Sequence, residues 1–323
     1  MPYRPPYTVN SRMVTLTNEI NRLIGQLEGY QWLRTNLKLR RVNKIRSLHS
    51  SLAIEGNQLS AEQVTAVLAG KRVMGPVKDI LEVTNAIAVY DRLTKLDPYS
   101  EDELLQTHET LMRGLVPDAG RYRASGVGVV DGERVIHVAP PAKQVPRLMG
   151  ELFSYLTDYE EDILIKSCVY HYEFEFIHPF SDGNGRMGRL WQTALLKTVY
   201  PDLAFVPIES MVYARQAEYY AALAQSGRDA TADAFILYSL STVRDAVREQ
   251  LNNLRPTAPD ADDRLRAFAE SWPGGEWFTR TDYRQYHKTL APATATRDLR
   301  SGVDTGLLER AGKLRTVRYR FVR

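Results

Sequence analysis

Apolar residues recur at helical spacing along most of this chain, whereas the strict alternation of a half-buried strand is scarce. Residues 11–28 show the pattern most clearly, with apolar side chains on one helical face: Met13, Leu16, Ile20, Leu23, Ile24 and Leu27. The same spacing predicts helices over residues 76–95, 101–114, 145–158, 162–176, 185–200, 211–225 and 231–253. Residues 60–63 have the composition of a capping box and predict the start of another helix. We therefore expect a mainly α fold.

One segment interrupts the helical pattern. Residues 120–141 contain short runs rich in valine and isoleucine on both sides of Asp131-Gly132, a dipeptide that is favoured in tight hairpin turns. This composition predicts a β-hairpin within an otherwise helical chain.

Changes in composition also suggest how the chain divides into domains. Residues 255–260 begin Arg-Pro-Thr-Ala-Pro, which is typical of a linker. Beyond them, helical patterns are followed by alternating residues around Gly312, an order that suggests a small winged helix-turn-helix domain over residues 261–323. Before the linker we expect an N-terminal helical region over residues 1–100, with one helix at about residues 40–56, and a core over residues 101–254.

Charge and cysteine content restrict the setting in which the protein works. The net charge of +3 gives the chain no general affinity for polyanions, and a basic run at residues 34–46 is typical of a solvated helix face. The single cysteine, Cys168, lies in an apolar stretch and is predicted to be a core residue. The start of the chain lacks the pattern of a signal peptide, and no apolar run is long enough to span a membrane. We expect a cytoplasmic protein without a membrane partner.

The C-terminal part carries a surplus of positive charge. From Arg297 to Arg323 there are eight basic residues and three acidic residues. Residues 293–300 could form a recognition helix, and its candidates for DNA contact are Thr294, Thr296, Arg297 and Arg300. Winged helices also serve as protein-interaction or dimerisation modules, and Asp298, Asp304 and Glu309 dilute the charge. DNA binding and a homodimer are therefore alternatives for this part.

The stretch HPFSDGNGRMGR, residues 178–189, concentrates several chemical groups. Its segment Asp182-Gly183-Asn184-Gly185 lies between two predicted helices, where glycines let successive N–H groups point to one side and form an anion nest. The following helix adds the positive end of its dipole at the same place. The Asp182 carboxylate suits Mg²⁺ that carries phosphates.

The flanking residues complete a site for a nucleoside triphosphate. Arg186 and Arg189 are three positions apart on the following helix, and guanidinium groups suit phosphate oxygens. His178 is a candidate general base near neutral pH. Taken singly, each feature is common in turns and on solvated helix faces. The eight specified positions of H-x-F-x-D-G-N-G-R-x-x-R coincide by chance on the order of 10⁻¹⁰ times per starting position.

The complete stretch matches the signature of the Fic family, which the chain resembles over about residues 1–245. The resemblance implies an α-helical bundle whose usual reaction transfers AMP from ATP to a hydroxyl group of a target protein, with pyrophosphate leaving. It implies that His178 is the base and that Asp182 holds Mg²⁺. It also implies that the phosphates are bound by Gly183, Asn184, Gly185, Arg186 and Arg189.

The resemblance gives the predicted hairpin a role as a flap over the substrate. An exposed hairpin edge can pair with an extended segment of a target protein and thereby align a Tyr, Thr or Ser hydroxyl. The residues implied in this docking are Val135, Ile136, His137 and Val138. A hairpin that only covers the core is the alternative.

A second motif lies upstream. Ser51 and Glu55 are four positions apart and share one helix face, and a glutamate near a helix C-terminus gains little from the helix dipole. With Gly56, these residues match the inhibitory motif of the Fic family, S/T-x-x-x-E-G/N. The resemblance implies that Glu55 pairs with Arg189 and occupies the place of the γ-phosphate.

These observations predict an autoinhibited protein adenylyltransferase with ATP as substrate and Mg²⁺ as cofactor, which acts on a target protein or on itself. A DNA-binding regulator that uses the Fic core as a nucleotide sensor is one alternative. A Fic enzyme that mainly removes AMP, or that transfers another phosphate-containing group, is another.

Overall fold

A computed structural model describes residues 3–29, 36–126, 128–131, 134–254, 260–273, 275–313 and 316–322, with side chains of residues 128–138 left aside. The chain divides into two compact units, Met1–Leu254 and Arg255–Arg323. We describe each unit by itself.

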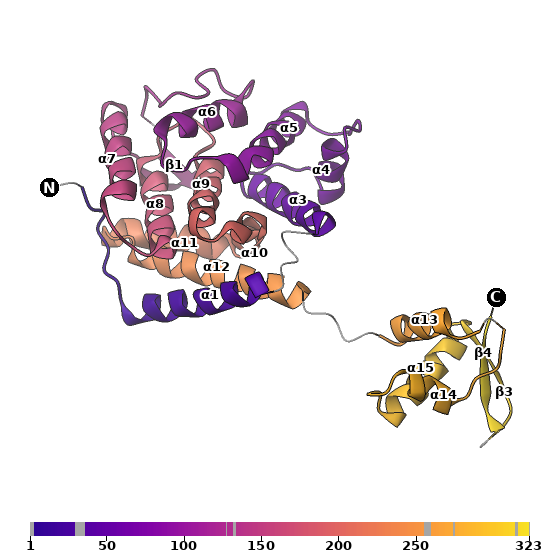
Figure 1. Ribbon diagram of the computed structural model, residues 1–323. Coiled ribbons are helices and arrows are strands. Elements are labelled where there is room, and N and C mark those ends of the chain that lie inside the picture. Colours follow the sequence, from indigo (N-terminus) through magenta and orange to yellow (C-terminus); the bar gives the residue numbers. More distant parts are fainter. Residues whose placement is uncertain are drawn as a thin grey trace. The chain divides into compact units, whose positions relative to one another are not determined.

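The first unit is a helical bundle with one hairpin (Figure 1). Its α-helices are α1 (Ser11–Gly29), α3 (Leu37–Ile54), α4 (Ala61–Leu68), α5 (Val77–Arg92), α6 (Glu101–Met112), α7 (Val145–Asp158), α8 (Ile163–Ile177), α9 (Asn184–Val199), α10 (Ile208–Ala214), α11 (Gln216–Asp229) and α12 (Asp233–Leu254). Short 3₁₀ turns are η1 (Leu93–Lys95), η2 (Ala142–Gln144) and η3 (Pro201–Phe205). The prediction of a mainly α chain is confirmed.

Helix α8 forms the centre of this unit. Every residue from Ile163 to Phe174 is buried, as expected for a helix that packs on all sides, and Cys168 is one of these core residues. Helices α7, α9 and α12 pack around α8, and α1 lies along α12 with the predicted apolar face turned inward. The ends of α8 and α9 that meet at residues 178–183 are therefore held by a rigid core.

Sequence periodicity located most helices but missed one break. The helix expected over residues 211–225 is wrong, because α10 and α11 are separate helices that meet at Arg215, whose backbone leaves the helical region (φ −125°, ψ 38°). The break lets α10 pack on α3 while α11 packs on α12. The predicted capping box at Ser60 and Gln63 is confirmed, with both of its hydrogen bonds present.

The predicted hairpin consists of two antiparallel strands, β1 (Gly128–Asp131) and β2 (Arg134–Val138). Gly128 pairs with Val138 and Asp131 with Arg134, with one irregularity between Val129 and Val130. Asp131 thus ends the first strand, and Gly132 of the predicted turn lies outside the described residues.

The second unit has its own small core. It contains α13 (Ala261–Ser271), α14 (Arg280–Tyr286), α15 (Pro292–Asp304) and an antiparallel ribbon of β3 (Leu308–Ala311) and β4 (Arg318–Phe321). Its fully buried side chains include Leu265, Phe268, Phe278, Tyr283 and Leu299. The ribbon turns at Gly312 (φ +87°), where a Cβ atom would lie 2.2 Å from the carbonyl oxygen of Thr316, so only glycine fits.

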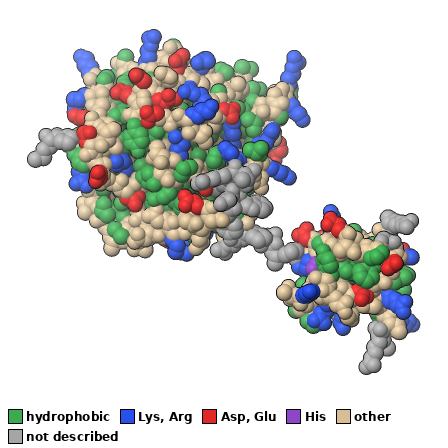
Figure 2. All heavy atoms as spheres, in the orientation of Figure 1, with side chains coloured by type: hydrophobic (Ala, Val, Ile, Leu, Met, Phe, Trp, Pro, Cys, Tyr) green, Lys and Arg blue, Asp and Glu red, His purple; other side chains and the backbone are tan. Residues whose placement is uncertain are grey.

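The charged side chains give the larger unit no single-signed face in the view of Figure 2, where acidic and basic groups are interspersed. Within the described ranges, no helix combines the length and apolar character needed to cross a membrane.

Candidate active site

The candidate site lies where α8 ends and α9 begins. His178 terminates α8 in the left-handed region (φ 50°, ψ 62°), which a non-glycine residue adopts only when its surroundings enforce it. Its side chain is 19% exposed, with Nδ1 lying 3.4 Å from the carbonyl oxygen of Glu175. The buried Arg123 donates to the His178 carbonyl at 2.7 Å and to the Pro140 carbonyl at 2.6 Å. The backbone of His178 is thus joined to the segment that follows the hairpin.

Three side chains hold the loop between His178 and α9. Phe180 is fully buried and stacks on His108, with ring centroids 3.6 Å apart. His108 Nδ1 accepts from the amide of Gly120, so Nε2 carries the proton and donates to the carbonyl oxygen of Asp182 at 3.0 Å. Burial lowers the pKa of His108 to about 4, and the ring is neutral near pH 7. The Asn184 amide spans the loop by bonding both backbone polar groups of Phe180.

Glycines shape the mouth of this loop. Gly183 has a φ of +86°, and a Cβ atom there would lie 2.7 Å from Met112 Sδ. The Asp182 carboxylate accepts from the Gly183 amide at 2.6 Å, and its side chain is 46% exposed. Asp182 therefore presents oxygen atoms to solvent at the N-terminus of α9, where the helix dipole favours anions.

Arg189 is held by the predicted inhibitory motif at the end of α3. Its Nη2 atom donates to Glu55 Oε1 at 2.7 Å and to the Ser51 carbonyl oxygen at 2.9 Å. The Arg189 side chain is 2% exposed and that of Glu55 is 28% exposed. Burial lowers the pKa of Arg189, but the adjacent Glu55 carboxylate outweighs this effect and the net shift is upward. Gly56, the last residue of the motif, reverses the chain with a φ of +87°.

The Glu55 carboxylate also lies close to Gly185 in the first turn of α9. A Cβ atom on Gly185 would lie 2.4 Å from Glu55 Oε1, so the carboxylate sits directly on the first turn of α9. This position is where backbone N–H groups and the helix dipole favour a phosphate. In this structure the carboxylate of Glu55, the C-cap residue of α3, thus lies beside the N-terminal turn of α9.

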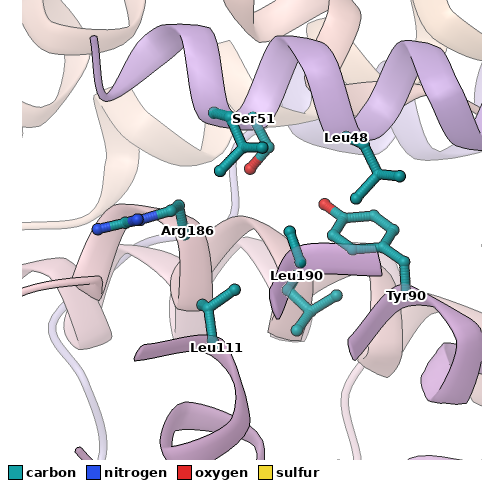
Figure 3. Close-up of a pocket in the computed structure, with 8 residues that line it drawn as sticks. Leu48, Ser51, Tyr90, Leu111, Arg186 and Leu190 are labelled. Atoms are coloured by element: carbon teal, nitrogen blue, oxygen red, sulfur yellow. The ribbon is translucent and has the colours of Figure 1, made fainter. Parts of the chain in front are cut away.

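Arg186 belongs to the first turn of α9 and is buried. Its side chain is 4% exposed and forms ion pairs with Asp182 at 3.0 Å and with Glu82 of α5 at 3.3 Å. It borders a small hollow among α3, α5, α6 and α9, which Figure 3 shows with Tyr90 across from Arg186 and Ser51 above them. The empty space of the hollow is about 240 Å³ with open solvent included.

Comparisons with known proteins agree on one family. The Fic/DOC family model matches residues 98–196. The crystal structure of a Fic family protein from Desulfovibrio desulfuricans G20 is 42% identical to this chain, covers 99% of it and 98% of the solved chain, and superimposes with a TM-score of 0.76. The chain belongs to the Fic family.

Curated relatives match over shorter stretches. Protein adenylyltransferase Fic of Nematostella vectensis is 30% identical over 46% of this chain and 36% of its own length. Protein adenylyltransferase fic-1 of Caenorhabditis elegans is 32% identical over 54% of this chain and 35% of its own length. This Fic protein therefore spans little more than a third of either relative.

Sequence reasoning missed three groups near the Fic motif. His108 and Glu82 come from helices distant in the sequence, and nothing local marks them. Glu175 lies one turn before His178, and its Oε2 atom is 4.0 Å from His178 Nδ1. Burial raises the pKa of Glu175 to about 8, although Arg189 acts in the opposite direction. Its place three residues before the histidine, on an apolar helix, was the one signal available in the sequence.

The remaining predicted site residues belong to strand β2 and to the second unit. The backbone of residues 135–138 forms strand β2, while the side chains of Val135, Ile136, His137 and Val138 lie outside the described part of the structure. On α15 of the second unit, Thr294 is half-buried and the other three candidates, Thr296, Arg297 and Arg300, are exposed. Their side chains thus point to solvent rather than into the core of that unit.

Proposed function

We propose that this Fic protein is an autoinhibited adenylyltransferase that moves AMP from ATP to a Tyr, Thr or Ser hydroxyl of a target protein. The arrangement of His178 beside an anion nest and two buried arginines carries this proposal. The names of the curated relatives, which are protein adenylyltransferases, support it.

The proposed reaction is a nucleotidyl transfer in which the target oxygen attacks the α-phosphorus. The hydroxyl proton passes to His178, the new oxygen–phosphorus bond forms, and the bond to the departing pyrophosphate breaks. Arg186 and Arg189 would neutralise the β- and γ-phosphates, and the amides of residues 183–185 would cradle the α- and β-phosphates. Because these groups are preset by α8 and α9, little reorganisation accompanies the reaction.

The residues present fit a magnesium ion. Asp182 offers a half-exposed carboxylate, and one carboxylate plus substrate phosphates is a common way to hold Mg²⁺. Within the described ranges, no group of three or more His, Cys, Asp or Glu side chains forms a metal site without substrate. When bound, the ion would neutralise charge on the phosphates, and Asp182 would hold it.

Inhibition follows from the contact between Glu55 and Arg189. In the proposed resting state the carboxylate takes the place of the γ-phosphate, so ATP binds weakly or with its α-phosphate misaligned for attack. The proposed role of β2 is to pair with an extended segment of the target and bring its hydroxyl to His178.

The test uses labelled ATP, Mg²⁺ and a cell lysate with wild type, Glu55→Gly and the double variant Glu55→Gly/His178→Ala. Glu55→Gly should label a lysate protein or itself well above wild type, and the double variant should label neither. The matched control is Glu28→Gly, which alters an exposed glutamate at the end of α1.

Equal labelling by wild type and Glu55→Gly would overturn the inhibitory role, and labelling by the double variant would overturn the role of His178. Mass spectrometry of the labelled protein separates AMP from other phosphate-containing groups. Loss of label from a purified modified target, when wild type is added, would instead identify removal of AMP as the main activity.

A second proposed function concerns the C-terminal unit, which we interpret as a winged helix that binds DNA. Asp298 is buried and held by Arg264 in two 2.6 Å contacts, and Glu309 pairs with Arg320 at 2.7 Å. The charges of these two acidic side chains are therefore compensated by arginines of the same unit. Arg297 of α15, in contrast, is exposed.

A gel shift of the full chain with random duplex DNA at physiological salt tests this second function. Retardation that is lost in Arg297→Ala is expected, and absence of retardation would exclude a DNA-binding regulator. In that case a homodimer or another protein is the partner of this unit, and sedimentation of the full chain distinguishes the two.

A further inference from the structure

Arg186 is a buried cation whose two carboxylate partners differ in exposure. Asp182 is 46% exposed, whereas Glu82 is 8% exposed. The Arg186 Nε and Nη1 atoms are buried without a hydrogen-bond partner, and Nη1 is the atom that lies 3.3 Å from Glu82 Oε1. A buried guanidinium needs a compensating charge, and Glu82 is the partner shielded from solvent.

Glu82 is itself fixed from the other side. Its Oε2 atom accepts from Asn57 Nδ2 at 2.8 Å, and the same Asn57 amide donates to the Asp79 carbonyl at 3.1 Å. Gln58, the next residue, donates its amide to the Asp79 carboxylate at 2.9 Å. One carboxylate oxygen of Glu82 is therefore anchored by the turn after α3. The other, Oε1, lies 3.3 Å from Arg186 Nη1 and 3.9 Å from Nζ of the exposed Lys78.

We propose that Glu82 is a positioning residue that holds Arg186 in the orientation needed for the β-phosphate. This inference rests on the function proposed above. If the Asp182 carboxylate holds a metal–phosphate group, it compensates less of the positive charge on Arg186. Glu82 then keeps the guanidinium compensated and oriented, because no other acidic side chain of the described residues forms an ion pair with Arg186.

The experiment measures binding of AMP and of ADP, with Mg²⁺, by calorimetry in a Glu55→Gly background. Glu82→Gln keeps an oxygen that can accept from Asn57 but removes the charge facing Arg186. We expect the affinity for ADP to fall on the order of 10- to 100-fold, by analogy with residues that orient metal-binding side chains. The affinity for AMP, which lacks the β-phosphate, should stay unchanged.

Two further variants make the result decisive. Adding Glu82→Gln to Arg186→Gln should not weaken ADP binding further, since Glu82 is proposed to act only through Arg186. The matched control is Glu103→Gln, which removes the charge from an ion pair with Arg92 at 2.8 Å on the surface and should leave both affinities unchanged. Thermal unfolding of each variant verifies that it is folded.

The proposal is overturned if Glu82→Gln lowers AMP and ADP affinity equally, if it lowers neither, or if it weakens ADP binding further in Arg186→Gln. Failure of the proposed function gives a different result. In that case Glu55→Gly labels no protein, while the preference for ADP over AMP still reports on Glu82.

Discussion

The contact between Glu55 and Arg189 predicts that Glu55→Gly loses stability while it gains affinity for ATP. The substitution removes a 2.7 Å charge-assisted hydrogen bond from a guanidinium that is 2% exposed. Such a bond contributes roughly 1.5–3 kcal/mol. Arg189 keeps its contact to the Ser51 carbonyl, so we take about 2 kcal/mol as the loss. For a folding unit of this size the melting temperature should fall by about 4–8 °C.

The same free energy should appear as a more favourable free energy of ATP binding to Glu55→Gly. In wild type a γ-phosphate has to displace the carboxylate from Arg189, whereas in Glu55→Gly the guanidinium is already available. A difference of about 2 kcal/mol corresponds to roughly thirtyfold tighter binding of ATP. Saturating ATP with Mg²⁺ should therefore raise the melting temperature of Glu55→Gly by more than it raises that of wild type.

Thermal unfolding with and without ATP, together with calorimetric titration, measures both quantities on the same samples. Glu28→Gly should behave like wild type in each. The reasoning is refuted if Glu55→Gly matches wild type in both stability and ATP affinity, or if it becomes more stable without ATP. Either result would mean that the observed pair does not compete with phosphate.

Three other substitutions test separate parts of the structure. Burial raises the pKa of Glu175 to about 8, so between about pH 4.5 and 8 the folded protein keeps a proton that the unfolded chain has lost, and stability falls as pH rises. The unfolding free energy of Glu175→Gln minus that of wild type, measured with denaturant, should therefore increase by about 3 kcal/mol between pH 5 and pH 8. A difference that stays constant with pH would contradict this. Gly183→Ala should lower the free energy of unfolding by about 1–3 kcal/mol, because the φ of Gly183 is +86° and Met112 occupies the space of a Cβ atom. An unchanged melting temperature would count against this strain. Asp298→Ala, which removes the buried carboxylate that accepts two hydrogen bonds from Arg264, should destabilise the C-terminal unit by about 3–5 kcal/mol, and unchanged hydrogen exchange in α15 would argue against this role.

Much of the fold followed from local pattern. Apolar spacing located α1 and predicted its buried face residue by residue, because a helix that packs on one side needs apolar groups at that period. The same reasoning failed at Arg215, where α10 and α11 separate. There the packing of α10 on α3 overrides a continuous helical pattern, and that contact joins residues far apart in the chain.

The candidate site divides in the same way. The order of His178, the glycine turn and the two arginines is contiguous, so the sequence alone was enough to predict a phosphate-binding turn with a base beside it. The resemblance of Ser51, Glu55 and Gly56 to the inhibitory motif of the Fic family also predicted which glutamate meets Arg189. Only the tertiary structure decided that Glu82 faces Arg186 and that His108 holds the loop. A buried charge and a buried carbonyl need partners wherever packing can bring them, and such partners follow no spacing in the sequence.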